Sequence, residues 1–132
     1  AHQAQLDYLC FDNFTWQGRA AEAYKKHSRA SFLGITRTEL IGKQGEQLNF
    51  ELRYFEIEAG GYTSLEKHLH THVIIIARGQ GQVQMADQSC QVKTNDVLYI
   101  EPLCVHQLSN PHPSIFGFYC IVDKQRDRPV LI

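Results

Sequence analysis

The sequence of 132 residues is 43% hydrophobic and 20% charged, and its formal net charge is −1. These values indicate one globular domain with a single core, and the scattered charges exclude an electrostatic nucleic-acid binder and a membrane-surface patch. No apolar run approaches the roughly 20 residues that cross a bilayer, and no basic region followed by an apolar stretch marks a signal peptide. We therefore expect a cytoplasmic protein without nucleic-acid or membrane partners.

Residues 1–31 have no clear period. Apolar residues such as Phe14 and Trp16 fit neither a helix nor a strand. Helix formers between Arg19 and Arg29 favour at most one or two helical turns. The sequence predicts an irregular N-terminal arm with at most a short helix. This arm would either contact a second copy of the chain or pack on its own domain, and both alternatives stay open.

From residue 32 to residue 132 the pattern is that of β-strands. Residues 35–41 alternate apolar and polar side chains, and residues 48–57 do so with a change of phase at Phe55 that indicates a bulge. Turn residues recur at intervals of roughly 8–12 residues, which is typical of an all-β sandwich or barrel. The expected strands cover residues 35–41, 48–57, 66–77, 82–85, 90–93, 97–100, 105–108, 115–122 and 130–132.

The four cysteines are widely separated and form no C-x-x-C pair. A thiolate zinc site of the finger type is therefore not expected. In a domain of this length we expect reduced thiols that act mostly as small hydrophobic side chains. The four are Cys10, Cys90, Cys104 and Cys120.

One stretch, residues 66–72, concentrates groups that bind metal ions. In an extended strand successive side chains point to opposite faces, so every second residue would share one face. Imidazole and carboxylate groups suit Zn, Fe, Mn, Ni and Co. The alternative is an exposed polar face that happens to be rich in histidine. The four candidate donors on this face are Glu66, His68, His70 and His72.

A further histidine, His106, lies four residues after Pro102. A turn built on the proline, followed by a short strand, would aim the imidazole back into the barrel. A histidine alone in such a place is more often structural. Together with the cluster some thirty residues earlier, His106 becomes a candidate ligand from a neighbouring strand.

The order of these residues resembles the two motifs of small single-domain cupins. In that family the first motif is Gly, then His-x-His, then Glu three or four residues later, then Gly seven residues after the Glu. Gly61 and Gly79 bracket the corresponding stretch. Counting back from Gly79 places His72 at the family's Glu, and Glu66 and His68 at its His-x-His, so that Glu and His are exchanged.

The second motif of the family is Gly-Asp, an apolar run, Pro, His and a later Asn. In this chain Asn95-Asp96 stands for Gly-Asp, and Leu103 replaces the usual glycine after the proline. Pro102, His106 and Asn110 match. The resemblance covers residues 48–122.

The resemblance implies a double-stranded β-helix, or jelly-roll barrel. Open sheet edges and the apolar N-terminal arm favour a homodimer. The resemblance also implies a divalent transition metal (Fe, Mn, Ni, Zn or Co) held by three imidazoles and one carboxylate, with a small-molecule ligand beside it in the barrel. The implied ligands are Glu66, His68, His72 and His106, with His70 as the rival of Glu66. Tyr54, Tyr99 and His70 are the candidates for contacts with the substrate.

A cupin of this kind would most simply be a metal-dependent enzyme. Dioxygenases, decarboxylases, lyases and isomerases occur among similar cupins, and they act on small oxygenated molecules such as carboxylates, diketones and sugar acids. The alternative is a binding module without catalysis that takes up a sugar, a carboxylate or the metal. A third alternative, a dimeric scaffold without metal, is disfavoured by the intact motif around His106.

Overall fold

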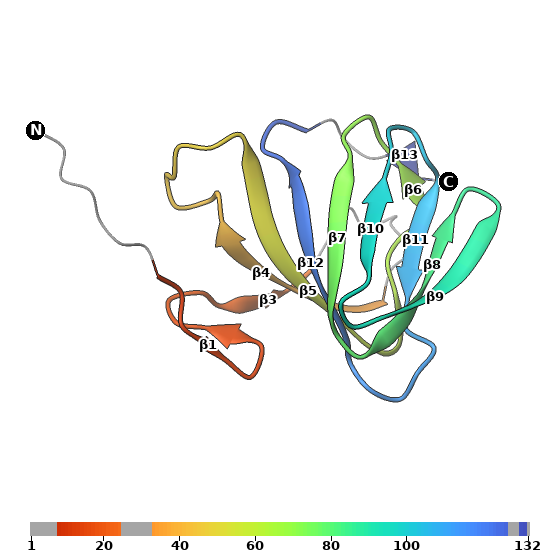
Figure 1. Cartoon of the computed structure of the whole chain (residues 1–132), viewed down its shortest axis with the longest axis horizontal. Helices are drawn as coiled ribbons and strands as arrows, with labels where there is room; N and C mark the ends of the chain where they lie inside the picture. Colours follow the sequence, from red (N-terminus) through yellow and green to blue (C-terminus); the bar gives the residue numbers. More distant parts are fainter. Residues whose placement is uncertain (1–7, 25–32, 127–129, 132) are drawn as a thin grey trace, which may run out of the picture.

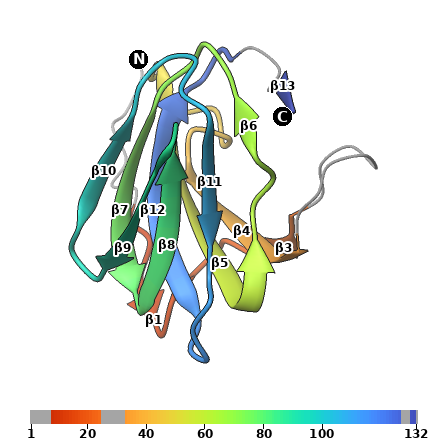
Figure 2. The same ribbon diagram turned by 90° about the vertical axis from the view of Figure 1, so that its right-hand side faces the viewer.

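The structure, a computed structural model, describes residues 8–24, 33–126 and 130–131. Every regular element within these ranges is a β-strand, and the expected all-β fold of the jelly-roll type is confirmed. Figures 1 and 2 show one antiparallel sheet that curls around a central space. Within the described ranges no helix is long and apolar enough to span a membrane.

Thirteen strands make up the described part of the chain, and two of them, β1 and β2, form a separate hairpin. The other eleven form the curled sheet, whose main path runs β10-β7-β12-β5-β11-β6-β13, with β4 and β3 added beside β5 and with β8 and β9 added beside β11. The strands are β1 (Phe11–Asp12), β2 (Thr15–Trp16), β3 (Ala21–Ala23), β4 (Leu33–Ile41), β5 (Phe50–Tyr62), β6 (Glu66–Lys67), β7 (His72–Arg78), β8 (Gln80–Met85), β9 (Gln88–Lys93), β10 (Val97–Ile100), β11 (His106–Ser109), β12 (Phe116–Asp123) and β13 (Val130–Leu131).

The sequence predicts at most a short helix between residues 19 and 29, and the structure has a strand in the part of that stretch that it describes. Ala21–Ala23 is strand β3, which pairs antiparallel with β4. Residues 25–29 lie outside the described residues. A strand forms here instead of a helix because the edge of β4 offers backbone hydrogen-bond partners over this stretch. A single turn of helix would leave most of its own backbone groups unpaired.

The N-terminal hairpin β1–β2 packs on the chain's own sheet (Figure 1). Trp16 is buried, and its ring lies 5.0 Å from the ring of Tyr54 and 6.0 Å from that of Tyr119, measured between centroids. Phe14, which belongs to the same hairpin, stacks on Tyr54 of β5. These contacts support the second alternative for the arm in residues 8–24, and the division into residues 1–31 and 32–132 stays a prediction.

Strand β5 is buried on both faces, which explains the change of phase in its sequence. Its pairing with β12 is unbroken from Phe50 to Ile57, so the bulge expected at Phe55 is wrong. Phe55 and Ile57 face the main core, whereas Tyr54 faces the second cluster under the N-terminal hairpin. Because both faces of the strand carry hydrophobic residues, the apolar pattern changes phase at Phe55 although the backbone alternates regularly.

Residues 66–77 form two strands rather than one. β6 ends at Lys67, a bend follows over residues 68–71, and β7 begins at His72. The prediction that Glu66, His68, His70 and His72 share one face of a single strand is therefore wrong. The bend, and not strand alternation, decides where the imidazoles in this stretch lie.

Two positions where the resemblance expects glycine have a left-handed backbone. Asn95 has φ 77° and Leu103 has φ 61°. Asparagine adopts this conformation at little cost, but a leucine is strained there. The amide of Leu103 donates to the carbonyl of His68 at 2.8 Å. The turn after β10 is therefore held to the bend between β6 and β7.

Candidate metal centre

Three histidines from separate parts of the sequence meet inside the barrel. One nitrogen each from His68, His72 and His106 lies within 4.8 Å of the others. His68 comes from the bend after β6, His72 opens β7, and His106 opens β11. β7 and β11 are not hydrogen-bonded to each other in the described sheet, so the curl of the sheet creates this cluster.

Each of the three rings has a partner on Nδ1. His68 Nδ1 lies 2.6 Å from the carbonyl oxygen of His70, and His106 Nδ1 lies 2.9 Å from that of Cys104. A carbonyl only accepts, so both Nδ1 atoms carry the proton and both Nε2 atoms keep a lone pair. Metal-binding histidines usually donate their second N–H in this way. The arrangement leaves Nε2 of both rings available as ligands.

His72 completes the group. Its Nδ1 lies 3.0 Å from Sγ of Cys120, and its Nε2 lies 2.9 Å from Nε2 of His68. Two imidazole nitrogens at this distance need a shared proton or a shared cation between them. The donor set therefore fits a transition metal, for which neutral imidazole is a preferred ligand.

Burial keeps the imidazoles of His68 and His72 neutral. It lowers the pKa of His68 to about 4, with a further contribution from the neighbouring His70. Burial and the charges of His68 and Arg53 lower the pKa of His72 as well. Because metal binding requires the deprotonated nitrogen, both rings are in the ligating form at neutral pH.

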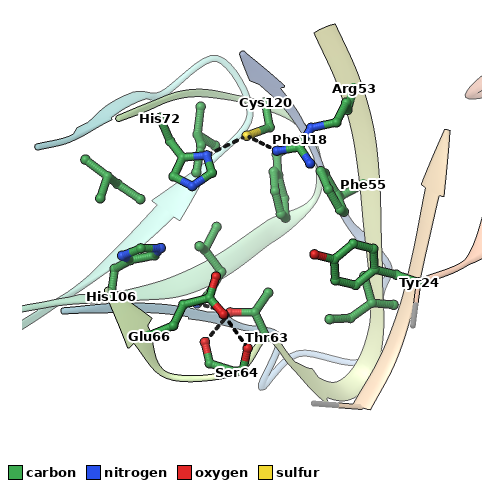
Figure 3. Close-up of a pocket in the computed structure, with 14 residues that line it drawn as sticks. Tyr24, Arg53, Phe55, Thr63, Ser64, Glu66, His72, His106, Phe118 and Cys120 are labelled. Carbon is green, nitrogen blue, oxygen red and sulfur yellow. Dashed lines mark hydrogen bonds between the residues drawn. The ribbon is translucent and has the colours of Figure 1, made fainter. Parts of the chain in front are cut away.

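Glu66 lies beside the three imidazoles. It is the direct cross-strand partner of His106 in the pairing of β6 with β11, and directly opposite residues point to the same side of a sheet. Its carboxylate accepts a hydrogen bond of 2.7 Å from the hydroxyl of Ser64. Both Glu66 and His106 line the same pocket (Figure 3).

His70, the alternative to Glu66 as the fourth ligand, lies in a different position. Its ring stacks on that of His68, with 3.6 Å between the centroids and 7° between the planes. Neither the nitrogens of His70 nor the carboxylate of Glu66 belongs to the compact group formed by His68, His72 and His106. The stacking orients the ring of His68, and the carbonyl of His70 fixes the tautomer of that ring.

The pocket beside the imidazoles has a cavity volume of about 70 Å³, and about 530 Å³ when its open mouth is counted. The first value lies below the ~300–1,000 Å³ that is typical of small-molecule sites. Apolar side chains of the core, among them Ile74 and Phe118, form one part of the wall. Polar side chains, among them Glu66, His72 and His106, form the other part.

Neither tyrosine expected in the pocket lies there. Tyr54 is buried on the opposite face of β5, where its hydroxyl donates to Glu56 at 2.8 Å. Tyr99 is 60% exposed, because alternation on β10 turns Leu98 and Ile100 inward instead. A different tyrosine, Tyr24, lines the pocket and turns its hydroxyl toward the interior (Figure 3).

Two further polar residues of the wall are Arg53 and Cys120, which lie next to each other on β5 and β12. Nη2 of Arg53 donates to Sγ of Cys120 at 3.4 Å. Cys120 is a buried free thiol, and burial raises its pKa. Sequence reasoning missed Arg53, although strand alternation places this charge on the same face as Phe55 and Ile57, which was a signal.

Comparison with known proteins agrees with this geometry. The family described as "Cupin domain" matches residues 53–122, which is more than half of the chain. The chain is a cupin. The cupin shares 36% identity over 118 residues with 1-methylthio-D-xylulose 5-phosphate methylsulfurylase of Rhodospirillum rubrum, covering 89% of this chain and 74% of that protein.

Two solved structures are similar to this cupin in sequence and in fold. A cupin 2 conserved barrel domain protein from Rhodopseudomonas palustris is 37% identical with a TM-score of 0.81, over 88% of this chain and 79% of that one. A cupin-2 domain protein from Rhodospirillum rubrum is 36% identical with a TM-score of 0.82, over 92% and 80% of the two chains. The barrel and its imidazole cluster thus belong to a cupin domain.

Proposed function

We propose that this cupin is a metal-dependent enzyme that acts on a small phosphorylated ketose carrying a methylthio group. The observation that carries the metal centre is the convergence of three buried imidazoles whose second nitrogens are already hydrogen-bonded. Support for the substrate class comes from the relative of Rhodospirillum rubrum, whose name gives 1-methylthio-D-xylulose 5-phosphate as its substrate. Its 36% identity extends over 89% of this chain.

The ligands in this proposal are His68, His72 and His106, with the carboxylate of Glu66 as the fourth. Ser64 would orient that carboxylate, and the carbonyls of His70 and Cys104 would orient two of the rings. A metal held there would polarise a carbonyl group as a Lewis acid. Which of the divalent ions is bound is set by supply as much as by the donors.

The chain itself would bind and shield the substrate. The apolar wall, including Ile74 and Phe118, excludes water from the space beside the imidazoles. Exclusion of water strengthens every electrostatic interaction in the pocket. The carboxylate of Glu66, the hydroxyl of Tyr24 and the guanidinium of Arg53 are among the polar groups that line this space beside the imidazoles (Figure 3).

The test is turnover of 1-methylthio-D-xylulose 5-phosphate by metal-loaded protein, followed through the methyl resonance of the methylthio group by proton NMR in the presence of a small thiol. We expect the resonance to shift as the C–S bond breaks, the methylthio sulfur forms a disulfide with the thiol and C1 of the ketose takes up a proton. The resonance should stay unchanged in chelator-treated protein. Saturable binding without turnover would instead support the binding module. Absence of both binding and turnover would contradict the proposed substrate.

We also propose a homodimer formed at strand β10. This strand pairs only with β7 in the described sheet, and its outward side chains Val97 and Tyr99 are 64% and 60% exposed. An open edge with apolar side chains favours pairing, and a second copy related by a two-fold axis presents the same edge. Sedimentation equilibrium should show a dimer at micromolar concentration, and Tyr99→Lys should shift it toward monomer. A wild-type protein that sediments only as monomer would contradict this.

A further inference from the structure

Arg53 is a buried cation in the wall of the pocket. It lies on β5 with 6% of its surface exposed, and its guanidinium carbon is 4.9 Å from the centroid of the Phe55 ring. Figure 3 shows the guanidinium at the side of the pocket that also holds Cys120 and His72. A buried charge of this kind is costly unless a partner of opposite charge compensates it.

No such partner is present among the described residues. Nη2 of Arg53 donates to a sulfur, which is a weak acceptor, and Nε has no hydrogen-bond partner there although it is shielded from solvent. None of the ion pairs between described residues includes Arg53. The guanidinium therefore has unused hydrogen-bonding capacity at the pocket wall.

The same strand shows how this fold treats a buried charge that is structural. Glu51, two residues before Arg53, is 1% exposed. Its carboxylate pairs with Arg126 at 2.6 Å and with Lys43 at 3.2 Å. Both cations keep the pKa of Glu51 below its usual value in spite of burial. Glu51 is fully compensated by the chain, whereas Arg53 is not.

We propose that Arg53 binds an oxyanion of the substrate at the side of the pocket next to the imidazoles. The planar guanidinium offers a fork of donors that matches phosphate and carboxylate oxygens. Sγ of Cys120 contacts both residues, at 3.4 Å from Nη2 of Arg53 and 3.0 Å from Nδ1 of His72. One small molecule would therefore contact Arg53 and the imidazole group together.

This inference rests on the proposed function and makes it more specific. Two groups of a phosphorylated ketose share the required chemistry: the phosphate, and the oxygen of the carbonyl group when it carries negative charge. Inorganic phosphate and acetate represent these two cases as probes, since acetate has the planar pair of oxygens and phosphate has the tetrahedral set. The anion that binds more tightly identifies the group.

The experiment compares wild type, Arg53→Met, Arg53→Lys and the matched control Arg37→Met. Arg37 lies on β4, is partly exposed, and pairs with Glu39 at 3.1 Å. Affinity for each anion is measured by calorimetry, and the thermal midpoint with and without anion is recorded. We expect Arg53→Met to lose about 10- to 100-fold in affinity, as expected for a hydrogen bond to a charged group, and Arg37→Met to bind like wild type.

Arg53→Lys keeps the charge but not the fork, so an intermediate affinity is expected. Without anion, Arg53→Met should be at least as stable as wild type, because an uncompensated buried charge is removed. Unchanged anion affinity in Arg53→Met, failure of wild type to bind either anion, or marked destabilisation of Arg53→Met without anion would overturn the proposal. Metal content, measured in parallel, reports separately on the imidazole centre and should not change in these variants.

Discussion

Replacing His106 by Ala is expected to lower the affinity for a divalent transition metal by at least about 100-fold. Loss of a group that merely orients a ligand already costs ~10- to 100-fold, and His106 would be a ligand itself. Its ring is buried, its Nδ1 is occupied by the carbonyl of Cys104, and its Nε2 is thereby directed to the group with His68 and His72. Elemental analysis after dialysis against a defined metal buffer measures the effect.

His112→Ala is the matched control. This histidine lies outside both motifs, in the loop between β11 and β12, where its Nε2 contacts the side chain of Gln91 at 3.0 Å. It should retain the wild-type metal content. If His68→Ala and His106→Ala both bind as much metal as His112→Ala, the ligand assignment is wrong. Far-UV circular dichroism of each variant separates loss of the site from loss of the fold.

The same measurement decides the fourth ligand. Glu66→Ala should lower metal affinity about 10-fold or more, since the carboxylate faces the same side of the sheet as His106. His70→Ala should have a smaller effect, because only stacking on His68 is lost while the carbonyl that orients His68 remains. The opposite order of effects would assign the fourth position to His70.

Replacing Trp16 by Ala is expected to lower the free energy of unfolding by about 3–5 kcal/mol, the usual cost of removing a large aromatic side chain from a core. Trp16 fills the space over Tyr54 and Tyr119 on the outer face of the sheet. Phe14 and Leu40 border the same cluster and would not refill it without movement of the hairpin. Urea denaturation followed by circular dichroism measures the shift in midpoint.

Tyr8→Ala is the control for this prediction, because Tyr8 precedes the same hairpin but is 74% exposed. A surface substitution of this kind usually changes stability by less than about 0.5 kcal/mol. Should Trp16→Ala be no more destabilising than Tyr8→Ala, the N-terminal hairpin is not part of the cooperative unit. The result would then favour the alternative in which the arm contacts a second copy.

The positions of most strands along the chain could be predicted, because most of these strands alternate regularly and end at turn residues. The bend over residues 68–71 could not be predicted, since its side chains by chance continue the alternation from Glu66 to His72. Only the pairing of β6 with β11 and of β7 with β10 and β12 separates the two strands. Such pairings are tertiary contacts that no local pattern contains.

The residues that line the pocket were harder to predict from the sequence than the histidines of the cluster. A histidine signals its chemistry by its type, but a wall residue is identified only by the face on which it lies. Tyr54 points away from the pocket because Trp16, from a segment with no readable period, covers the other face of β5. Arg53 therefore occupies the inward position beside it, where hydrophobicity alone would favour an apolar residue.

Strands β7 and β11, which carry His72 and His106, share no backbone hydrogen bonds in the described sheet. An ion bound by His72 and His106 would thus act as a reversible cross-link that closes the chain between the two motifs. Such a link favours the folded state by mass action, with about 2.7 kcal/mol at a free concentration 100 times the dissociation constant. Metal supply would then set the lifetime of this protein as well as its activity.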